Sequence, residues 1–413
     1  MQYKIEKLDN FGRGISHINN KIVFISNALG DEVVDATTTY SNKKFDEAKV
    51  NEIIEVSRMR IKPICPYFDI CGGCNLLHMN YDDQLKFKYN KVKDIIFKYL
   101  KENIKVNDVI YSNQFNYRNK ASFEVKEKLC YKMRKSTNLV DINYCYLLDK
   151  NINDIVHVLN NLNLKNINNI TIRTGEEDIM VIISGNPTQE IIDALKEKAR
   201  SIYVNDKLVY GRSNIVSKIG NYEFFVSDKS FFQVNKYNVK NLYDKVLEYA
   251  ELTGNENILD LYCGTGTIGI YLSKYAKSVI GIEVNEQAIF DANVNKNKNN
   301  IENISFICDT TSNINNIENI SFICDTTSNI NNIVNNDFDV IIVDPPRSGL
   351  DKNTINFLIN SKAKRIVYVS CDIMTLVRDL NILKQDYDIR EITPVDMFPN
   401  TYHVECVCVL NLK

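Results

Sequence analysis

A glycine-rich turn between two apolar strands constrains this chain more than any other stretch. Residues 258–261 are mostly apolar and predict a short buried strand. Three glycines follow it: Gly264, Gly266 and Gly269. A helical pattern comes next, and residues 278–283 predict a second strand that ends in the carboxylate of Glu283. This order is typical of a nucleotide-binding βαβ unit, in which an acid accepts hydrogen bonds from ribose hydroxyls. We therefore expect an α/β fold that binds an adenosyl or dinucleotide ligand.

The spacing of the glycines separates these two ligands. It is not the G-x-G-x-x-G spacing that serves a pyrophosphate. The run D-L-Y-C-G-T-G-T-I-G at residues 260–269 is closer to the loop with which class I methyltransferases hold S-adenosylmethionine. The alternative is a glycine turn in an ordinary α/β core.

Length and composition limit the class of protein. A chain of 413 residues exceeds one ordinary core and predicts two or three domains. No apolar run approaches the ~20 residues of a membrane span, and the first residues contain no signal-peptide core, so we expect a cytoplasmic protein without membrane contact. With a net charge of −2, any nucleic-acid-binding surface must be a local patch. The 11 cysteines are expected to be free, catalytic or metal-bound rather than paired in disulfides.

Residues 1–60 predict a small β domain. Short apolar segments at 23–25 and 32–34 are separated by glycine, asparagine and aspartate turns. Their pattern resembles the TRAM domain, a small β-barrel found on RNA-modifying enzymes. Residues 29–32 read Leu-Gly-Asp-Glu where that family usually has Pro-Gly-Glu.

Three cysteines with the spacing C-x5-C-x2-C follow in a loop that contains glycines: Cys65, Cys71 and Cys74. Zinc usually takes four ligands from paired knuckles, whereas iron–sulfur clusters often take three neighbouring cysteines and a remote one. The remote candidates are Cys130 and Cys145. We expect an iron–sulfur cluster, with zinc or unliganded structural cysteines as alternatives.

Two basic segments are candidates for contact with RNA. Residues 81–100 predict a lysine-rich amphipathic helix, and such lysines most often form a solvated face. Residues 115–135 interleave basic and aromatic side chains over strand candidates, which suits phosphates and stacked bases. Because basic strands are common, these residues alone leave RNA contact open.

Residues 299–314 are repeated letter for letter as residues 315–330. Two identical copies are typical of a recent tandem duplication or a sequence artefact, since a solenoid needs three or more repeats. Each copy has one strand candidate, at 304–308 or 320–324. A doubly wound sheet has room for one of them, so we expect the other copy to form a surface excursion. The distance from Glu283 favours the first copy, and closeness to the next strand favours the second.

Three later strand ends carry reactive side chains. Residues 338–343 predict a buried strand that ends at Asp344, and residues 365–370 predict another that ends at Cys371. Glu405 opens an otherwise apolar strand, where a carboxylate is costly unless it is paired or functional. In open α/β sheets, ligands bind at the carboxyl ends of the strands. A lone cysteine in such a place can equally be a packing residue.

Taken in order, these motifs resemble the RNA uracil-5-methyltransferases, in particular the branch with a TRAM domain and an iron–sulfur cluster. The resemblance covers almost the whole chain and also includes residues 117–120, 232–235, 344–347, 370–372 and 403–405. It implies a class I (Rossmann-like) methyltransferase domain at 236–413. It also implies a TRAM/OB-like β-barrel at 1–60 and an α+β central iron–sulfur domain at 61–235, whose helix near 81–100 packs on the catalytic domain.

The same resemblance assigns roles to residues. Cys371 is the nucleophile that adds to uracil C6, and Glu405 is the base that removes the C5 proton. The S-adenosyl-L-methionine site comprises Gln233, Tyr262, Thr267, Glu283, Thr310 and Asp344, with Asp309 beside Thr310 and a duplicate pair at 325–326. The 4Fe-4S cluster is held by Cys65, Cys71, Cys74 and Cys145. From the residues alone, Gln233 is a candidate cap for the helix that begins near Asn235.

The branch also implies a substrate, a uridine in 23S ribosomal RNA, which must be flipped out of its stack to reach Cys371. A monomer is expected. Three alternatives remain: methylation of a transfer RNA T-loop uridine by a related branch that usually lacks the cluster, N-methylation at an Asp-Pro-Pro-Tyr-like motif, and a non-catalytic iron–sulfur RNA-binding protein. Arg347 after the two prolines disfavours N-methylation. The non-catalytic protein would arise if the duplication broke the methyltransferase sheet.

Overall fold

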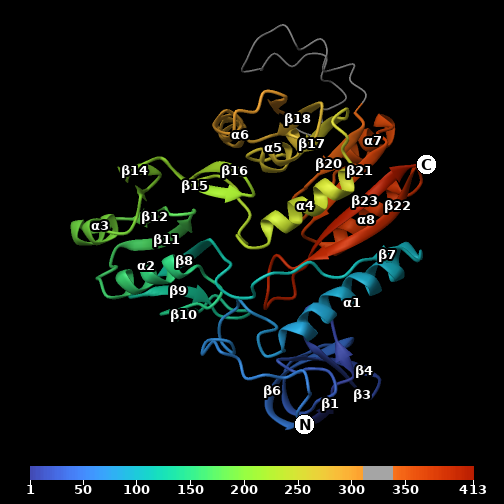
Figure 1. Ribbon diagram of the computed structural model, residues 1–413. Helices are drawn as coiled ribbons and strands as arrows, with labels where there is room; N and C mark the ends of the chain where they lie inside the picture. Colours follow the sequence, from blue (N-terminus) through green and yellow to red (C-terminus); the bar gives the residue numbers. More distant parts are fainter. Residues whose placement is uncertain (310–337) are drawn as a thin grey trace.

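The computed structural model describes residues 1–309 and 338–413 (Figure 1). In these two ranges the strands form four sheets, of six, seven, two and eight strands. Thr310, the duplicate pair at 325–326 and the strand candidate at 320–324 lie outside the described residues.

The six-stranded sheet belongs to the N-terminal residues and has the order β1-β5-β6-β4-β3-β2. The strands are β1 Gln2–Lys4, β2 Lys7–Leu8, β3 Gly14–Ile18, β4 Lys21–Ser26, β5 Val33–Ser41 and β6 Phe45–Glu55. Alternate residues of β4, Val23 and Ile25, are buried in a small core with Val34 and Ala36 of β5. This period of two is typical of a sheet with one face packed on a core and the other face exposed to solvent. The N-terminal β-rich region was therefore predicted correctly.

The seven-stranded sheet has the order β10-β9-β8-β11-β12-β13-β14, and α2 and α3 cover it. Its elements are β8 Lys120–Val125, β9 Leu129–Lys132, β10 Leu139–Asp141, α2 Lys150–Asn160, β11 Ile167–Thr174, β12 Ile179–Gly185, α3 Gln189–Lys196, β13 Ser201–Val204 and β14 Lys207–Gly211. A separate hairpin follows, formed by β15 Asn214–Ile219 and β16 Tyr222–Ser227.

The eight-stranded sheet has the order β19-β18-β17-β20-β21-β23-β22-β7. Its strands are β17 Asn257–Leu261, β18 Ser278–Glu283, β19 Ile304–Cys308, β20 Val340–Val343, β21 Arg365–Ser370, β22 Tyr387–Val395, β23 Glu405–Leu412 and β7 Lys105–Val106. The run from β19 to β21 is parallel, and β23 is antiparallel to both of its neighbours. Because β17 lies between β18 and β20, the crevice at its carboxyl end is the topological switch point where ligands bind in such sheets.

Helices cover both faces of this sheet (Figure 1). They are α1 Tyr81–Leu100, α4 Val239–Ala250, α5 Thr267–Ser273, α6 Glu286–Lys298, α7 Lys352–Ser361 and α8 Ile373–Leu383. Successive residues of β20, Ile341 and Ile342, enter different core clusters. Burial on both faces explains why the parallel strands are continuously apolar instead of alternating.

Helix α1 packs against the eight-stranded sheet, although it precedes the seven-stranded sheet in sequence. The Asn80 side chain caps its first turn by accepting from the backbone N–H of Asp83 at 3.0 Å. Its apolar residues Val92 and Ile96 belong to the same core cluster as Leu376 and Leu380 of α8. The short strand β7 then extends the sheet beside β22, an addition that the sequence did not predict.

The strand of the first repeat copy, β19, pairs in parallel with β18 at the edge of the sheet. The prediction that one copy enters the sheet is therefore correct, and the first copy does so. The second copy lies outside the described residues. In the part of the chain that the structure describes, no helix is long and apolar enough to span a membrane.

Candidate active site and cysteine-lined cavity

The loop between β17 and α5 has the backbone shape that its glycines predict. Gly264 has φ +53° and Gly266 has φ +76°, both in the left-handed region that glycine adopts without strain. A Cβ at Gly266 would lie 2.4 Å from the Phe306 ring, so a larger residue there would have to displace that ring. The backbone N–H of Gly264 donates to the Glu283 carboxylate at 3.2 Å. The loop and the acid at the end of β18 are therefore held together.

Several predicted cofactor residues surround this loop. Tyr262 follows β17 with φ +61°, and Thr267 begins α5. Gln233 is buried, and the carbonyl of Phe231 beside it accepts from the Thr265 hydroxyl at 3.5 Å. This bond brings the segment before α4 to the glycine loop.

The hypothesis that Gln233 caps the following helix is wrong. Helix α4 begins after Asn238, five residues beyond Gln233. The Asn235 side chain instead orders the turn just before α4, because its Oδ1 accepts the backbone N–H groups of Tyr237 and Asn238, each at 3.1 Å.

Cys371 and Glu405 lie at the same carboxyl edge of the sheet, Cys371 directly after β21 and Glu405 at the start of β23. In the antiparallel register of β21 and β23, Ser370 pairs with Cys406, so the next opposed positions are Cys371 and Glu405. Asp344 follows β20, the strand beside β21, and its backbone N–H donates to Leu261 O at 3.4 Å. The thiol and both carboxyl groups therefore lie at the edge that also carries the glycine loop.

Glu405 is buried, Asp344 and Cys371 are partly buried, and burial raises the pKa values of all three groups. Burial raises the pKa of Asp344 to about 7. Burial and the charge of Asp344 raise the pKa of Glu405 to about 8. Burial and the charges of Glu405 and Asp344 raise the pKa of Cys371 to about 11. Strongly shifted acids that influence one another in a crevice are typical of catalytic centres.

Two further residues, Arg347 and Tyr243, interact electrostatically with this centre, and neither was predicted to belong to it. The Arg347 guanidinium opposes the upward pKa shifts of Cys371 and Glu405. Tyr243 of α4 shares a 2.7 Å hydrogen bond with Thr267, and the charges of Asp344 and Glu405 contribute to raising its pKa. Arg347 was visible only as part of a motif. Tyr243 lies in a helical apolar pattern and could be predicted only as core.

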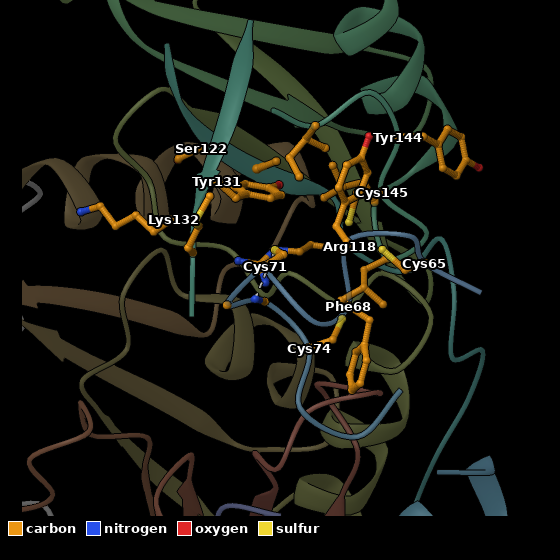
Figure 2. Close-up of a pocket in the computed structure, with 18 of the residues that line it drawn as sticks. Cys65, Phe68, Cys71, Cys74, Arg118, Ser122, Tyr131, Lys132, Tyr144 and Cys145 are labelled. Atoms are coloured by element: carbon orange, nitrogen blue, oxygen red, sulfur yellow. Dashed lines mark hydrogen bonds between the residues drawn. The ribbon is translucent and has the colours of Figure 1, made fainter. Parts of the chain in front are cut away.

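A second site lies in the central part of the chain, where four predicted ligands line one cavity of about 570 Å³. Figure 2 shows Cys65, Cys71, Cys74 and Cys145 around a common space. Tyr131, Phe68 and Arg118 also line the cavity. Cys130, the other remote candidate, instead makes 3.2 Å hydrogen bonds through its thiol to Lys128 O and Asp141.

The other three thiols contribute to the raised pKa of Cys74. Burial is the largest cause of this shift, and the charges of Cys145, Cys71 and Cys65 raise the pKa further. Four thiolates would thus repel one another unless a cationic group compensated them. Among the described residues, no group of three or more His, Cys, Asp or Glu side chains is compact enough to hold a metal ion.

Comparison with known proteins gives a consistent family. Residues 189–413 match the family model described as tRNA (Uracil-5-)-methyltransferase. A protein of Clostridium tetani described as an uncharacterized RNA methyltransferase is 33% identical, over 97% of this chain and 93% of its own. A Staphylococcus aureus protein with the same description is 32% identical, over 98% and 96% of the two chains.

A solved structure is similar over the whole molecule. It is the tRNA (uracil-54, C5)-methyltransferase of Pyrococcus abyssi in complex with S-adenosyl-L-homocysteine. The two folds superpose with a TM-score of 0.79 at 28% sequence identity, and the match covers 99% of each chain. The described sheets are thus part of an architecture that the two proteins share.

Proposed function

The chain belongs to the family of RNA uracil-5-methyltransferases, and from this premise we propose that it methylates a uridine of 23S ribosomal RNA through a covalent bond between Cys371 and uracil C6. Its reaction class is S-adenosylmethionine-dependent methylation of uracil C5 in RNA. The covalent route is supported above all by one observation: Cys371 and Glu405 occupy opposed positions at the end of β21 and the start of β23.

Uracil C5 is a poor nucleophile, and addition of the proposed thiolate at C6 makes C5 more nucleophilic. The Cys371 sulfur forms a bond to C6, and the electron pair of the C5–C6 double bond moves into an enolate. C5 then bonds to the donor methyl group, and S-adenosylhomocysteine leaves. Glu405 takes the proton from C5, the double bond re-forms, and the Cys371 thiolate departs. One hard step is thereby divided into easier ones.

The raised pKa values fit these roles in different ways. A carboxylate with a pKa of about 8 is a stronger base than an ordinary glutamate, which suits Glu405 for removing a carbon-bound proton. A thiol with a pKa of about 11 is mostly protonated at neutral pH, so the centre must become more favourable to anions when substrates bind. When bound, S-adenosylmethionine supplies an electrophilic methyl group and a positive sulfonium charge, which favours the ionised forms of these acids. Arg347 acts in the same direction.

The proposal assigns the methyl donor to the crevice at the glycine loop. Glu283 accepts from the loop and is the residue placed to accept from ribose hydroxyls as well. Gln233, Tyr262, Thr267 and Asp344 complete the part of this site that the structure describes. Thr310, one residue beyond the described Asp309, belongs to the same proposal.

The proposal also includes a 4Fe-4S cluster held by Cys65, Cys71, Cys74 and Cys145. Four cysteines around one cavity support it. When present, the cluster supplies iron to four thiolates and ties residues 65–74 to the segment around Cys145. This part of the chain, together with the proposed TRAM domain at 1–60, is assigned to RNA binding, since methyl transfer requires no electron.

Transfer RNA is the second candidate substrate. It is favoured by the similar structure from Pyrococcus abyssi, whose substrate is uracil 54 of tRNA. The site chemistry is the same for both substrates, because both offer a uridine that must be unstacked before a thiol can reach C6. The choice between them depends on surfaces outside the catalytic centre.

Mapping 5-methyluridine in total RNA of a deletion strain tests the substrate directly. Loss of 5-methyluridine from a 23S position, with recovery on complementation by the wild-type gene but not by a Cys371→Ala gene, is the expected result. Loss from the tRNA T-loop alone would replace the 23S proposal by the tRNA one. Unchanged 5-methyluridine in both RNAs would refute both.

A further inference from the structure

A cleft of about 460 Å³ opens where the N-terminal sheet, the cysteine-bearing loop and the segment before β23 meet. Its walls come from segments far apart in the sequence, including residues 11–13, 26–27 and 134–135, with Gly72, Asn75 and Tyr402. We propose that this cleft holds a nucleotide next to the target uridine in the same RNA strand, with its base against Phe11. The inference rests on the proposed function, because that function makes RNA the strand in question.

Phe11 is an aromatic residue of the cleft wall whose ring remains exposed to solvent. It is 54% exposed, although a phenylalanine normally buries most of its surface. Its ring centroid lies 5.3 Å from that of Tyr402, with 82° between the two planes. The Arg13 guanidinium carbon also lies 5.6 Å from the centre of the Phe11 ring, so a base would stack on the ring area that neither Arg13 nor Tyr402 covers. Every nucleobase has a face that stacks on such a ring, so the site needs no particular base.

The charges in the cleft favour a phosphate backbone. Three cations, Arg13, Arg134 and Lys135, line it together with one carboxylate, Glu47. Glu47 accepts from Arg13 at 2.9 Å and from Lys135 at 2.7 Å, so its negative charge is compensated. The residues that line the cleft are therefore net positive, although Asp9 outside the lining also pairs with Arg13 at 2.7 Å, and this charge attracts the phosphates that flank a stacked base.

The cleft is continuous with the catalytic segment. The rings of Tyr402 and His403 lie 4.3 Å apart, and β23 begins two residues later with Glu405. The Lys91 ammonium lies 5.2 Å from the centre of the Tyr402 ring and donates to Tyr402 O at 2.9 Å. A strand that places its uridine at the catalytic centre thus finds Tyr402 and then Phe11 next along the surface.

The competing explanation is that Phe11 only joins the N-terminal sheet to Tyr402. In that case its loss would lower stability or turnover for every RNA and would leave no signal from the base beside the uridine. The two explanations therefore differ in what a reporter base at that position detects.

The experiment uses the full-length protein and an unstructured ten-nucleotide RNA with one uridine, flanked in turn on each side by 2-aminopurine. Stacking quenches 2-aminopurine, so quenching and Kd are both read from fluorescence. We expect Phe11→Ala to abolish the quenching at one flanking position and to raise Kd about 10-fold. Phe11→Trp should retain both. Phe97→Ala is the matched control, since Phe97 is an exposed ring on α1 outside the cleft (68% exposed, against 54% for Phe11).

Equal Kd and equal quenching for wild type and Phe11→Ala would overturn the inference, and so would a loss shared by Phe97→Ala. The failure of the proposed function looks different. A wild-type protein that forms no 5-methyluridine in ribosomal or transfer RNA, yet binds the oligonucleotide in a Phe11-dependent manner, would remove the catalytic proposal and leave the nucleotide site standing.

Discussion

Cys371 and Glu405 are the next opposed residues beyond the Ser370–Cys406 pair of the antiparallel strands β21 and β23. One strand therefore supplies a thiol and its neighbour a carboxyl group at the same point of the sheet edge. The Oε2 atom of Glu405 is buried and has no hydrogen-bond partner among the described residues. A buried polar atom of this kind is costly unless a ligand satisfies it. The first two predictions concern substitutions of Cys371 and Glu405.

Replacing the thiol should stop the reaction at its first step. We expect Cys371→Ala to form neither 5-methyluridine nor an RNA adduct that survives denaturation, because the proposed bond to C6 is made by the Cys371 sulfur. Methylation is measured by transfer of a labelled methyl group to RNA, and the adduct by a shift on a denaturing gel. Cys408→Ala, which removes another buried thiol from β23, is the control and should remain active. An active Cys371→Ala protein would contradict the covalent route.

Replacing the base should stop the reaction at its last step. In Glu405→Gln the thiol and the methyl donor are unchanged, so the adduct should form and then persist. We expect turnover to fall by about 10² to 10⁴-fold, while the fraction of RNA found as adduct rises above that of wild type. The measurement is the same denaturing gel, followed over time. Loss of turnover without any adduct would mean that Glu405 acts earlier than proposed.

The raised pKa of Cys371 can be measured without RNA. In the protein alone, alkylation of Cys371 by iodoacetamide should be slow at pH 7 and rise about tenfold per pH unit toward the pKa of about 11. Removing the opposing cation in Arg347→Leu raises that pKa further, so alkylation at pH 9 should slow. Glu405→Gln removes a negative charge, so alkylation at pH 9 should be faster. Mass spectrometry of the Cys371 peptide reports the rate.

The thiol of Cys308 at the end of β19 serves as the reference in each sample, since it lies at the far side of the sheet order from β21. Its rate should change little between the variants. Equal Cys371 rates in wild type, Arg347→Leu and Glu405→Gln would mean that these charges do not reach the thiol.

The cysteine-lined cavity predicts a coloured protein. Anaerobically purified wild type should show the broad visible absorbance of an iron–sulfur cluster, and Cys71→Ser or Cys145→Ser should lose it. Cys130→Ser should keep it, because that thiol bonds to Lys128 O and Asp141 instead. Binding of S-adenosylmethionine should survive the loss of the cluster, since the glycine loop belongs to a different sheet. Colourless wild type with no iron by metal analysis would remove the cluster.

Local patterns were enough to predict part of the fold. The strand at 278–283 and the helix at 81–100 were predicted with the bounds that the structure has, because apolar runs and caps mark their ends. The two residues of β7 carry no such pattern, and their place in the sheet depends on β22, nearly three hundred residues further along the chain. The length of a strand can thus be read from sequence more readily than its partner.

The arrangement of the site depended on the same kind of long-range pairing. That Asp344 and Cys371 lie at the ends of strands could be predicted, since an apolar run ends just before each of them. The opposition of Cys371 and Glu405 depends on the register of β21 against β23, which no local pattern contains. Likewise, Cys130 and Cys145 could not be distinguished until the hairpin of β9 and β10 turned one away from the cavity.

A buried ion pair connects α1 with the segment that leads to Glu405. Lys88 donates to Asp396 at 2.5 Å, and both side chains are fully buried. Tyr81 also donates to Asp396 at 2.9 Å. Removing one member of a buried pair leaves the other charge without compensation, which costs about 3–5 kcal/mol. We therefore expect Lys88→Met to lower the free energy of unfolding by that amount in urea denaturation.

The control for this prediction lies on the same helix. Lys86 pairs with Asp83 at 3.2 Å, but its side chain is 72% exposed, so Lys86→Met should cost less than about 1 kcal/mol. The double variant Lys88→Met/Asp396→Leu removes both buried charges and should recover part of the loss, because the uncompensated carboxylate is gone. If Lys88→Met and Lys86→Met were equally stable, burial would not be what makes the Lys88–Asp396 pair matter.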